Sequence, residues 1–405
     1  MPKYNFDKLI NRKGTDCIKW DCNLERFGNA HLLPMWIADM DFQTPQFFLN
    51  ALKKKIDKGV LGYGCRPKKW GSAVTTWFKE EYNWKIEASQ IGFVPGIVVG
   101  LCHALRCFTQ KGDRVLIQPP VYYPFRNQIL AAGCTVVNNP LKLVARKDKA
   151  LSTTIYDFEI DWADFEKKIK TCKVFILCNP HNPGGRVWSE AELKKMASIA
   201  LKYKVLVLSD EIHCDLSFTH HIPFATVNKK QAQNTITFHA PSKTFNCAGL
   251  GASEWVAENP KLHSVFESYL SAGEFSSGHY LSFLPAIELY TNKGREWLSQ
   301  AKEYIWNNII FTEKYLKENF TVGGKQLVTM VQPHASFLIF LNFRELGISQ
   351  SQLVSTILNK AHLALNDGAT FGPGGEGFMR LNVGCPRATL EKALKAIKRA
   401  ISTIK

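Results

Sequence analysis

The chain has 405 residues, 45% of them hydrophobic and 21% charged, a composition that excludes an intrinsically disordered protein and is ordinary for a folded enzyme of two domains. The formal net charge is +16, but lysine and arginine are scattered along the chain, which argues against a nucleic-acid partner. The eleven cysteines are dispersed without a CxxC pair, so we expect reduced thiols and no metal site.

Short apolar runs alternate with amphipathic segments over roughly residues 90–245. A helix is predicted at 190–203, and another in the tail at 386–405, where apolar residues keep to one helical face. The alternation predicts an α/β fold with an open, largely parallel sheet covered by helices on both faces. The β-branched, fully apolar runs that we interpret as buried parallel strands are 115–117, 174–177, 205–208 and 236–238.

No apolar run approaches the roughly 20 residues of a membrane span, and residues 1–15 lack an apolar signal core. We therefore expect a cytoplasmic protein with no membrane partner. Each predicted strand is followed by an unusual polar set, and ligands of such sheets bind beyond the carboxyl ends of the strands. The four sets, which should converge on one cleft, are QPPVYYPF, NPHNPGG, SDEIHCD and APSKTFN.

In this order, the four sets resemble the motifs of fold-type I pyridoxal-phosphate enzymes of the class I/II aminotransferase superfamily. The resemblance implies an aspartate-aminotransferase-like fold and pyridoxal 5'-phosphate as cofactor. Lys243 of APSKTFN matches the catalytic lysine that holds the cofactor through an imine, which needs a side-chain amine. Asp210 of SDEIHCD matches the carboxylate that keeps the pyridine nitrogen protonated, so that the ring accepts electrons. A helix cap is the structural alternative for Asp210.

The resemblance assigns three further side chains to the cofactor ring. Asn182 of NPHNPGG matches the residue that donates a hydrogen bond to the phenolic oxygen, and His213 is expected to face the same oxygen. A buried structural histidine is the alternative for His213. Tyr122 matches the aromatic residue that stacks on the ring and is also assigned to the substrate site; the neighbouring Tyr123 is its rival.

The cofactor phosphate is expected at a helix start. Gly96 opens a predicted helix, where the backbone amides of Ile97 and Val98 would bind an anion, and Ser242 would add a hydroxyl. The glycine turn alone is a weak phosphate signal. The arginine that aminotransferases place eight residues after the lysine is absent, because that position is Gly251.

Two further motifs concern the partner subunit and the substrate. Tyr63 of LGYG matches a tyrosine that reaches the phosphate of the neighbouring subunit, which implies a homodimer; an ordinary turn tyrosine is the alternative. Arg380 of GFMRLN matches the arginine that binds the substrate α-carboxylate, and its planar fork suits bidentate binding. Ala38 is also assigned to the substrate site, whereas Arg387 is assigned a structural role.

The cofactor motifs do not select a reaction, because the same ring supports several. The segments KWD (19–21), MWIADMDF (35–42), LGYG, PHNPGGRVW and SDEIHCDL resemble the cystathionine β-lyase family of MalY/PatB type, which includes cystalysin. Residues 335–337, Ala-Ser-Phe, depart from its usual Gly-Thr-aromatic segment. The resemblance implies a large cofactor-binding domain at 46–289 around the sheet, and a smaller α+β domain from 1–45 and 290–405.

The implied reaction is α,β-elimination on cystathionine, cysteine or an S-conjugate, which yields pyruvate, ammonia and a thiol. Lys243 would remove the α-proton, which needs a lowered amine pKa. An aminotransferase would use the same cofactor residues and is the main alternative. A cofactor-binding protein with a regulatory role is a further one, against which the intact Lys243, Asp210, Asn182 and Arg380 argue.

Overall fold

The structure is a computed structural model that describes residues 4–148 and 153–404. Its centre is a seven-stranded sheet in the order β2-β10-β9-β8-β7-β3-β4. All neighbours pair in parallel except β10, which runs antiparallel to both β2 and β9. The prediction of a largely parallel sheet is confirmed. The strands are β2 (Ile91–Val94), β3 (Arg114–Ile117), β4 (Thr135–Asn138), β7 (Val174–Cys178), β8 (Leu206–Asp210), β9 (Thr235–His239) and β10 (Ser253–Val256).

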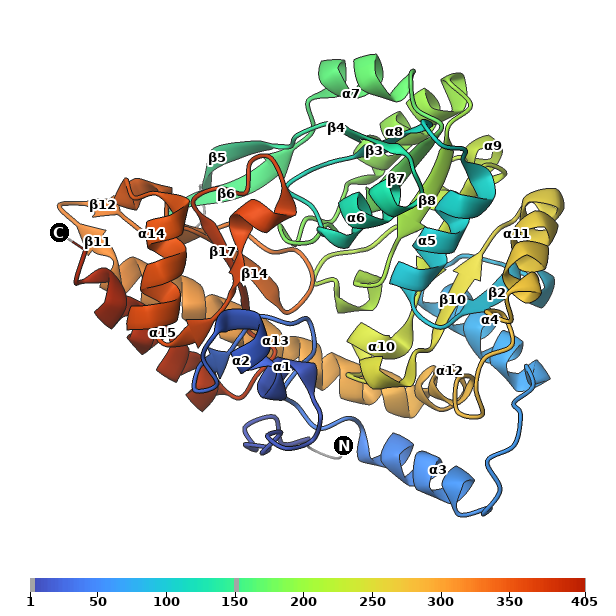
Figure 1. Cartoon of the computed structure of the whole chain (residues 1–405), viewed down its shortest axis with the longest axis horizontal. Coiled ribbons are helices and arrows are strands. Elements are labelled where there is room, and N and C mark those ends of the chain that lie inside the picture. Colours follow the sequence, from blue (N-terminus) through green and yellow to red (C-terminus); the bar gives the residue numbers. More distant parts are fainter. Residues whose placement is uncertain (1–3, 149–152, 405) are drawn as a thin grey trace.

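Helices cover both faces of this sheet (Figure 1). Side chains alternate along β7, so that Val174 and Ile176 pack into the core on one face while Phe175 and Leu177 pack into the core on the other. This explains why the strand is apolar at every position. One face is covered by α5 (Ile97–Phe108), α6 (Pro124–Ala131) and α11 (Pro260–Ala272), and the other by α7 (Trp162–Ile169) and α8 (Glu190–Lys202).

A second group of elements comes from the two ends of the chain and lies at one side of the molecule in Figure 1. Its antiparallel sheet has the order β13-β14-β17-β16, and β1 near the N-terminus pairs in parallel with β15. This pairing supports our proposal that 1–45 and 290–405 form the smaller domain. The elements are β1 (Leu33–Pro34), β13 (Thr329–Met330), β14 (Leu338–Asn342), β15 (Leu363–Ala364), β16 (Asn366–Asp367), β17 (Phe378–Asn382), α13 (Asn292–Asn319), α14 (Gln350–Ser355) and α15 (Arg387–Ile401).

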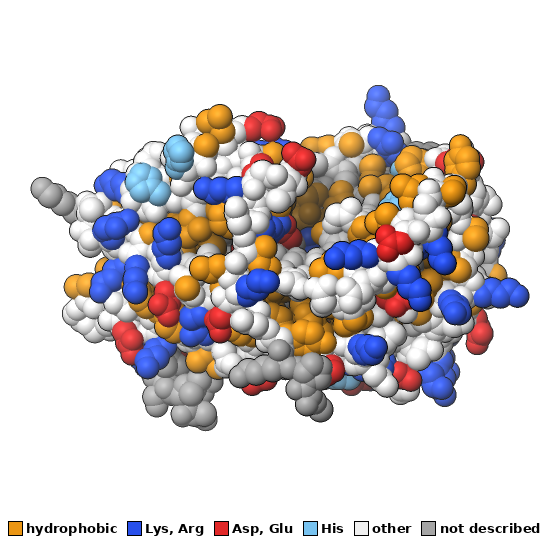
Figure 2. All heavy atoms as spheres, turned by 90° about the horizontal axis from the view of Figure 1, so that it is seen from below, with side chains coloured by type: hydrophobic (Ala, Val, Ile, Leu, Met, Phe, Trp, Pro, Cys, Tyr) orange, Lys and Arg blue, Asp and Glu red, His pale blue; other side chains and the backbone are white. Residues whose placement is uncertain are grey.

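Further elements lie outside the seven-stranded and four-stranded sheets. No helix in the described ranges is long and apolar enough to cross a membrane. On the face drawn in Figure 2, lysine and arginine side chains are spread among acidic, apolar and uncharged polar groups. The remaining helices and strands are α1 (Ile18–Asp21), α2 (Asn23–Phe27), α3 (Gln46–Ile56), α4 (Lys68–Tyr82), β5 (Lys142–Asp148), β6 (Thr153–Glu159), α9 (Lys229–Ala232), α10 (Pro241–Thr244), α12 (Leu284–Leu289), β11 (Thr321–Val322) and β12 (Lys325–Gln326).

Candidate active site

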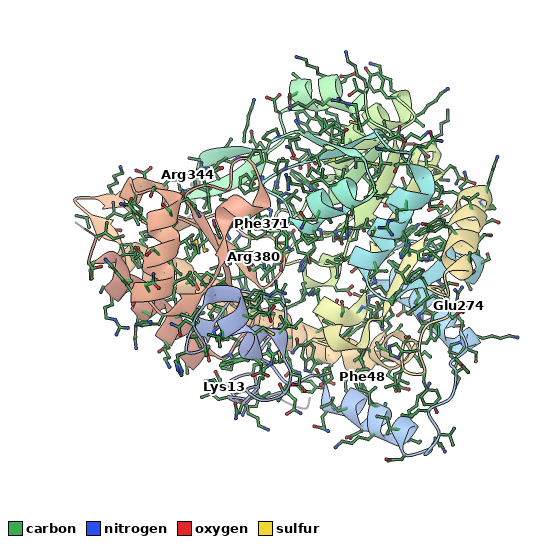
Figure 3. The ribbon with its side chains drawn as sticks, in the orientation of Figure 1. Lys13, Phe48, Glu274, Arg344, Phe371 and Arg380 are labelled. Carbon is green, nitrogen blue, oxygen red and sulfur yellow. The ribbon has the colours of Figure 1, made fainter. Side chains whose placement is uncertain are left out.

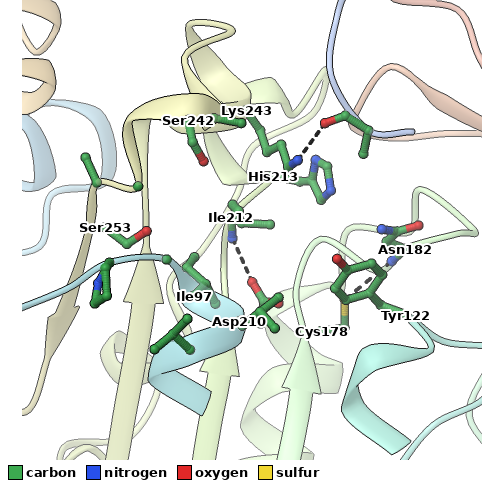
Figure 4. A pocket seen from close by; sticks show the side chains of 18 residues that line it. Ile97, Tyr122, Cys178, Asn182, Asp210, Ile212, His213, Ser242, Lys243 and Ser253 are labelled. Carbon is green, nitrogen blue, oxygen red and sulfur yellow. Dashed lines mark hydrogen bonds between the residues drawn. The ribbon is translucent and has the colours of Figure 1, made fainter. Parts of the chain in front are cut away.

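A cavity of about 270 Å³ lies where β7 and β8 end and α5 begins (Figure 4). Parallel strands place their carboxyl ends at one edge of the sheet, and the segments that follow them meet there. The structure brings together all the predicted site residues except Arg380 and Tyr63 in the lining of this cavity. Those that line it are Ala38, Gly96, Ile97, Val98, Tyr122, Asn182, Asp210, His213, Ser242 and Lys243.

Lys243 lies on α10, the short helix that follows β9. Its Nζ donates a hydrogen bond to the carbonyl oxygen of Ala38 at 2.6 Å. Burial lowers the pKa of Lys243 to about 8, although the nearby Asp39 carboxylate works in the opposite direction. The amine is therefore much easier to deprotonate at neutral pH than a surface lysine, which a nucleophile or a general base requires.

Asp210 is the last residue of β8 and lies at the floor of the cavity. One carboxylate oxygen accepts a hydrogen bond from the backbone N–H of Ile212 at 3.1 Å. Burial raises the pKa of Asp210 to about 7, although the nearby Lys243 works in the opposite direction. A cation brought by a ligand would stabilise the ionised carboxylate, so this group suits a protonated ring nitrogen.

Asn182, Tyr122 and His213 line the cavity from three different loops. The Asn182 side-chain oxygen accepts from Arg380 Nη1 at 3.1 Å, which leaves its amide nitrogen as a donor. Burial raises the pKa of Tyr122 to about 12 and lowers that of His213 to about 3, so both are neutral at pH 7. His213 Nδ1 is buried without a hydrogen-bond partner in the described chain. A planar polar ligand could use these groups.

The start of α5 lines the cavity with groups that suit an anion. Gly96 precedes the helix with a φ of 129°, a conformation that L side chains rarely adopt. The first amides of a helix lack intrahelical acceptors and carry partial positive charge, and those of Ile97 and Val98 belong to residues that line the cavity. The hydroxyl-bearing residues Ser242 and Ser253 line it as well. This combination suits a phosphate group.

Arg380 lies on β17, behind Asn182, and is 3% exposed. Its Nη2 donates to the carbonyl oxygen of Trp36 at 2.9 Å and to Asn366 Oδ1 at 2.7 Å. The guanidinium lies over the Phe371 ring, 5.1 Å from the centroid, and Figure 3 labels the two residues near each other. Its Nε is buried and has no partner among the described residues. The fork is thus rigidly held with a donor left over, which suits a substrate carboxylate.

Tyr63 lies outside the cavity of its own chain. It belongs to the segment between α3 and α4 and is fully exposed. Within one chain, therefore, the structure does not bring Tyr63 together with the other predicted residues.

Sequence reasoning missed several groups at this site. Ser253 begins β10, and because that strand is antiparallel its first residue lies at the same edge as the carboxyl ends of the parallel strands. A correct assignment of strand direction would have found it. Cys178 ends β7 and lines the cavity. Asn366 and the carbonyl of Trp36 hold Arg380, and no sequence motif predicts these two contacts.

A buried polar network lies behind Lys243. Thr244 Oγ1 donates to Asp215 Oδ2 at 2.8 Å, and His239 lies between Asp215 and Glu254, at 3.3 and 2.7 Å. Burial works against a proton on His239, but Cys214 and Asp215 outweigh it and raise its pKa well above the usual value. Through the hydrogen bond to Asp215, the network fixes Thr244, the residue that follows Lys243.

Comparison with known proteins agrees with this geometry. Residues 30–397 match the model of the aminotransferase class I and II family, and the chain belongs to that family. It is 40% identical over 402 residues to cystathionine beta-lyase PatB of Bacillus subtilis, with 98% of this chain and 100% of that protein covered.

Two solved structures are also similar. Cystalysin from Treponema denticola, which contains a pyridoxal 5'-phosphate cofactor, has a TM-score of 0.91 and 30% identity, with 100% of both chains covered. The PLP-bound C-S lyase from Staphylococcus hominis has a TM-score of 0.86 and 29% identity, with 99% of both chains covered. The predicted fold type and family resemblance are confirmed.

Proposed function

We propose that this protein is a pyridoxal-phosphate-dependent carbon–sulfur β-lyase. It cleaves S-substituted cysteines, such as cystathionine, by α,β-elimination to pyruvate, ammonia and a thiol. The observation that carries this proposal is the placement of a buried amine, Lys243, in one cavity with Asp210 and the α5 amides, in a chain 40% identical to a cystathionine beta-lyase along its whole length.

The residues present fit the cofactor. Asp210 would hold the ring nitrogen, Asn182 and His213 the phenolic oxygen, and the face of Tyr122 the ring itself. The Gly96–Val98 amides with Ser242 would hold the phosphate, and they would do so without the arginine of aminotransferases, because Gly251 stands at its position. When bound, the cofactor withdraws electrons from the substrate α-carbon.

The chain's own residues account for binding and proton movement. Arg380 would hold the α-carboxylate through the donors that its protein partners leave free. Lys243 Nζ would take the α-proton, for which its lowered pKa prepares it, while the bond from the β-carbon to sulfur breaks and the sulfur leaves with the electron pair. The same Nζ would return a proton to the leaving sulfur. Water then completes the conversion to pyruvate and ammonia.

We also propose that the enzyme acts as a homodimer. Val60, Leu61 and Tyr63 are 74%, 70% and 108% exposed in the single chain. This group of exposed apolar side chains supports an interface with a second copy. A second copy would cover it and would receive the Tyr63 hydroxyl at its own phosphate site.

The assay uses purified protein reconstituted with pyridoxal 5'-phosphate and then given L-cystathionine. Pyruvate and thiol should appear in equal amounts when no keto-acid acceptor is added. A requirement for a keto-acid acceptor, with no thiol released, would identify an aminotransferase instead. Size-exclusion chromatography of the purified protein tests the dimer, because the protein should elute at the size of two chains.

A further inference from the structure

The segment 36–41, here called the strap, passes across both cationic residues of the proposed site. Trp36 offers its carbonyl oxygen to Arg380 Nη2 at 2.9 Å, and Ala38 offers its carbonyl oxygen to Lys243 Nζ at 2.6 Å. Two carbonyls of one short segment therefore orient the proposed carboxylate-binding group and the proposed base together.

The intervening carbonyls of the strap are fixed by another residue. Asn382 Nδ2 donates to the carbonyl oxygens of Ile37 and Asp39, at 2.7 and 2.6 Å. Further along, the Asp41 N–H donates to the Gly384 carbonyl at 2.7 Å. Carbonyls thus alternate between the site cations and Asn382, so a shift of the strap by one residue would break all four bonds.

Charged side chains clamp the strap from its outer side. Lys19, which is completely buried, pairs with Asp41 at 2.7 Å. Arg12 pairs with Asp39 and with Asp41, each at 2.7 Å, and Trp20 Nε1 donates to Asp41 at 3.1 Å. Burial alone would raise the pKa of Asp41, but Lys19 and Arg12 outweigh it and lower the pKa, so the carboxylate stays charged.

Stability alone is a poor reason for such a cluster. Buried ion pairs gain little over apolar packing, because desolvation offsets the attraction, and in some proteins their role is to specify one arrangement of the segments that carry them. The clamp residues belong to 12–20 and 39–41, parts of the chain that supply no group to the predicted cofactor site. What their arrangement fixes is the position of the Trp36 and Ala38 carbonyls.

We propose that Lys19, Arg12 and Asp41 are positioning residues for catalysis: they clamp the strap so that its carbonyls hold Arg380 for the substrate carboxylate and Lys243 for proton transfer. The proposal rests on the β-lyase function, which gives those two residues their roles. When its amine is free, Lys243 has the Ala38 carbonyl as its hydrogen-bond acceptor.

The first test measures Lys243 in the cofactor-free protein by trace acetylation followed by mass spectrometry across pH. The charged and titratable groups that act on this amine are Asp39, Arg380, Asp210, Cys247 and His213. Arg12→Gln and Lys19→Met each remove a cation that neutralises Asp39, so the Asp39 charge raises the pKa of Lys243 further. A rise of one unit cuts the amine fraction at pH 8 from about one half to about one tenth, with a matching fall in labelling.

Asp39→Asn should change the pKa of Lys243 in the opposite direction. It removes the charge that raises the pKa of Lys243, so labelling near pH 7 should increase. A general loosening of the fold would instead change the labelling of Lys243 in the same direction in all three variants. Lys202→Met, which breaks an exposed ion pair with Glu166, is the matched control and should leave the labelling profile unchanged. If Lys19→Met does not fold, Arg12→Gln decides, because Arg12 is partly exposed.

Steady-state kinetics with L-cystathionine give the second readout. Arg12→Gln should raise KM at least fivefold and lower kcat, while the affinity of the cofactor-free protein for pyridoxal 5'-phosphate changes less than twofold. Folded Arg12 and Lys19 variants with wild-type labelling and wild-type KM would overturn the proposal. If the wild type releases no pyruvate, the proposed function fails, whereas the labelling result still decides whether the clamp acts on Lys243.

Discussion

Replacement of Arg380 by lysine tests the substrate-binding site most directly. The guanidinium uses Nη1 for Asn182 Oδ1 and Nη2 for both the Trp36 carbonyl and Asn366 Oδ1. A single ammonium group cannot keep these three acceptors and also bind a carboxylate along two parallel N–H bonds. Lysine keeps the positive charge, so the change isolates the loss of the planar fork.

The magnitude follows from one lost charge-assisted hydrogen bond to the substrate. Such a bond contributes about 1.5–3 kcal/mol, and each 1.4 kcal/mol is tenfold, so kcat/KM should fall about 10- to 150-fold. Most of this loss should appear as a higher KM, because carboxylate binding is present before the reaction and during it.

The assay is pyruvate release from L-cystathionine over a range of substrate concentrations, with cofactor absorbance recorded in parallel. Arg387→Lys is the matched control. That arginine lies on α15 and donates to Asn308 Oδ1 and the Asn307 carbonyl, away from the cavity. A folded Arg380→Lys enzyme with the KM of the wild type would refute the assignment.

Three further outcomes are expected. Lys243→Ala should abolish both the visible absorption of the bound cofactor and turnover, whereas Lys202→Met should retain both. Asp215→Asn should lower the free energy of unfolding at pH 7, measured by urea titration, by at least about 2 kcal/mol, because the pKa of Asp215 is lowered to about 2 in the folded protein. A carboxylate with a lowered pKa stabilises the fold at pH values above its pKa in the unfolded chain. The difference between wild type and variant should therefore shrink as the pH falls from about 4 to about 2. Tyr63→Phe should weaken cofactor binding about tenfold in equilibrium titrations without lowering the melting temperature, since Tyr63 is exposed in its own chain.

Local sequence signals predicted the central sheet and one end of the site. Buried parallel strands are apolar on both faces, and the segments after β7, β8 and β9 carry Asn182, Asp210 and Lys243. These residues could be found because topology alone brings the ends of parallel strands together. The lowered pKa of Lys243 also follows from a buried position in such a cleft.

The groups that orient these side chains could not be predicted in the same way. Lys19 is completely buried, although a lone lysine in a sequence is normally a surface residue. Arg380 is held by a backbone carbonyl and by Asn366, which belongs to a different strand. Backbone carbonyls have no sequence signature, and the pairing of β16 with β17 depends on tertiary contacts. The role that we propose for Tyr63 depends on a second chain.

The proposed reaction places Arg380 and Lys243 in one buried site, where a positive charge on one disfavours a positive charge on the other. Arg380 and burial both lower the pKa of Lys243, while Asp39 and Asp210 raise it, and the balance lies at about 8. At pH 7 about one tenth of such an amine is neutral, against about one in three thousand for a surface lysine with the usual pKa of about 10.5. The strap contributes to this balance, because it carries Asp39 and the carbonyls that contact both side chains. A base that works at neutral pH therefore depends on the N-terminal segment as well as on Lys243 itself.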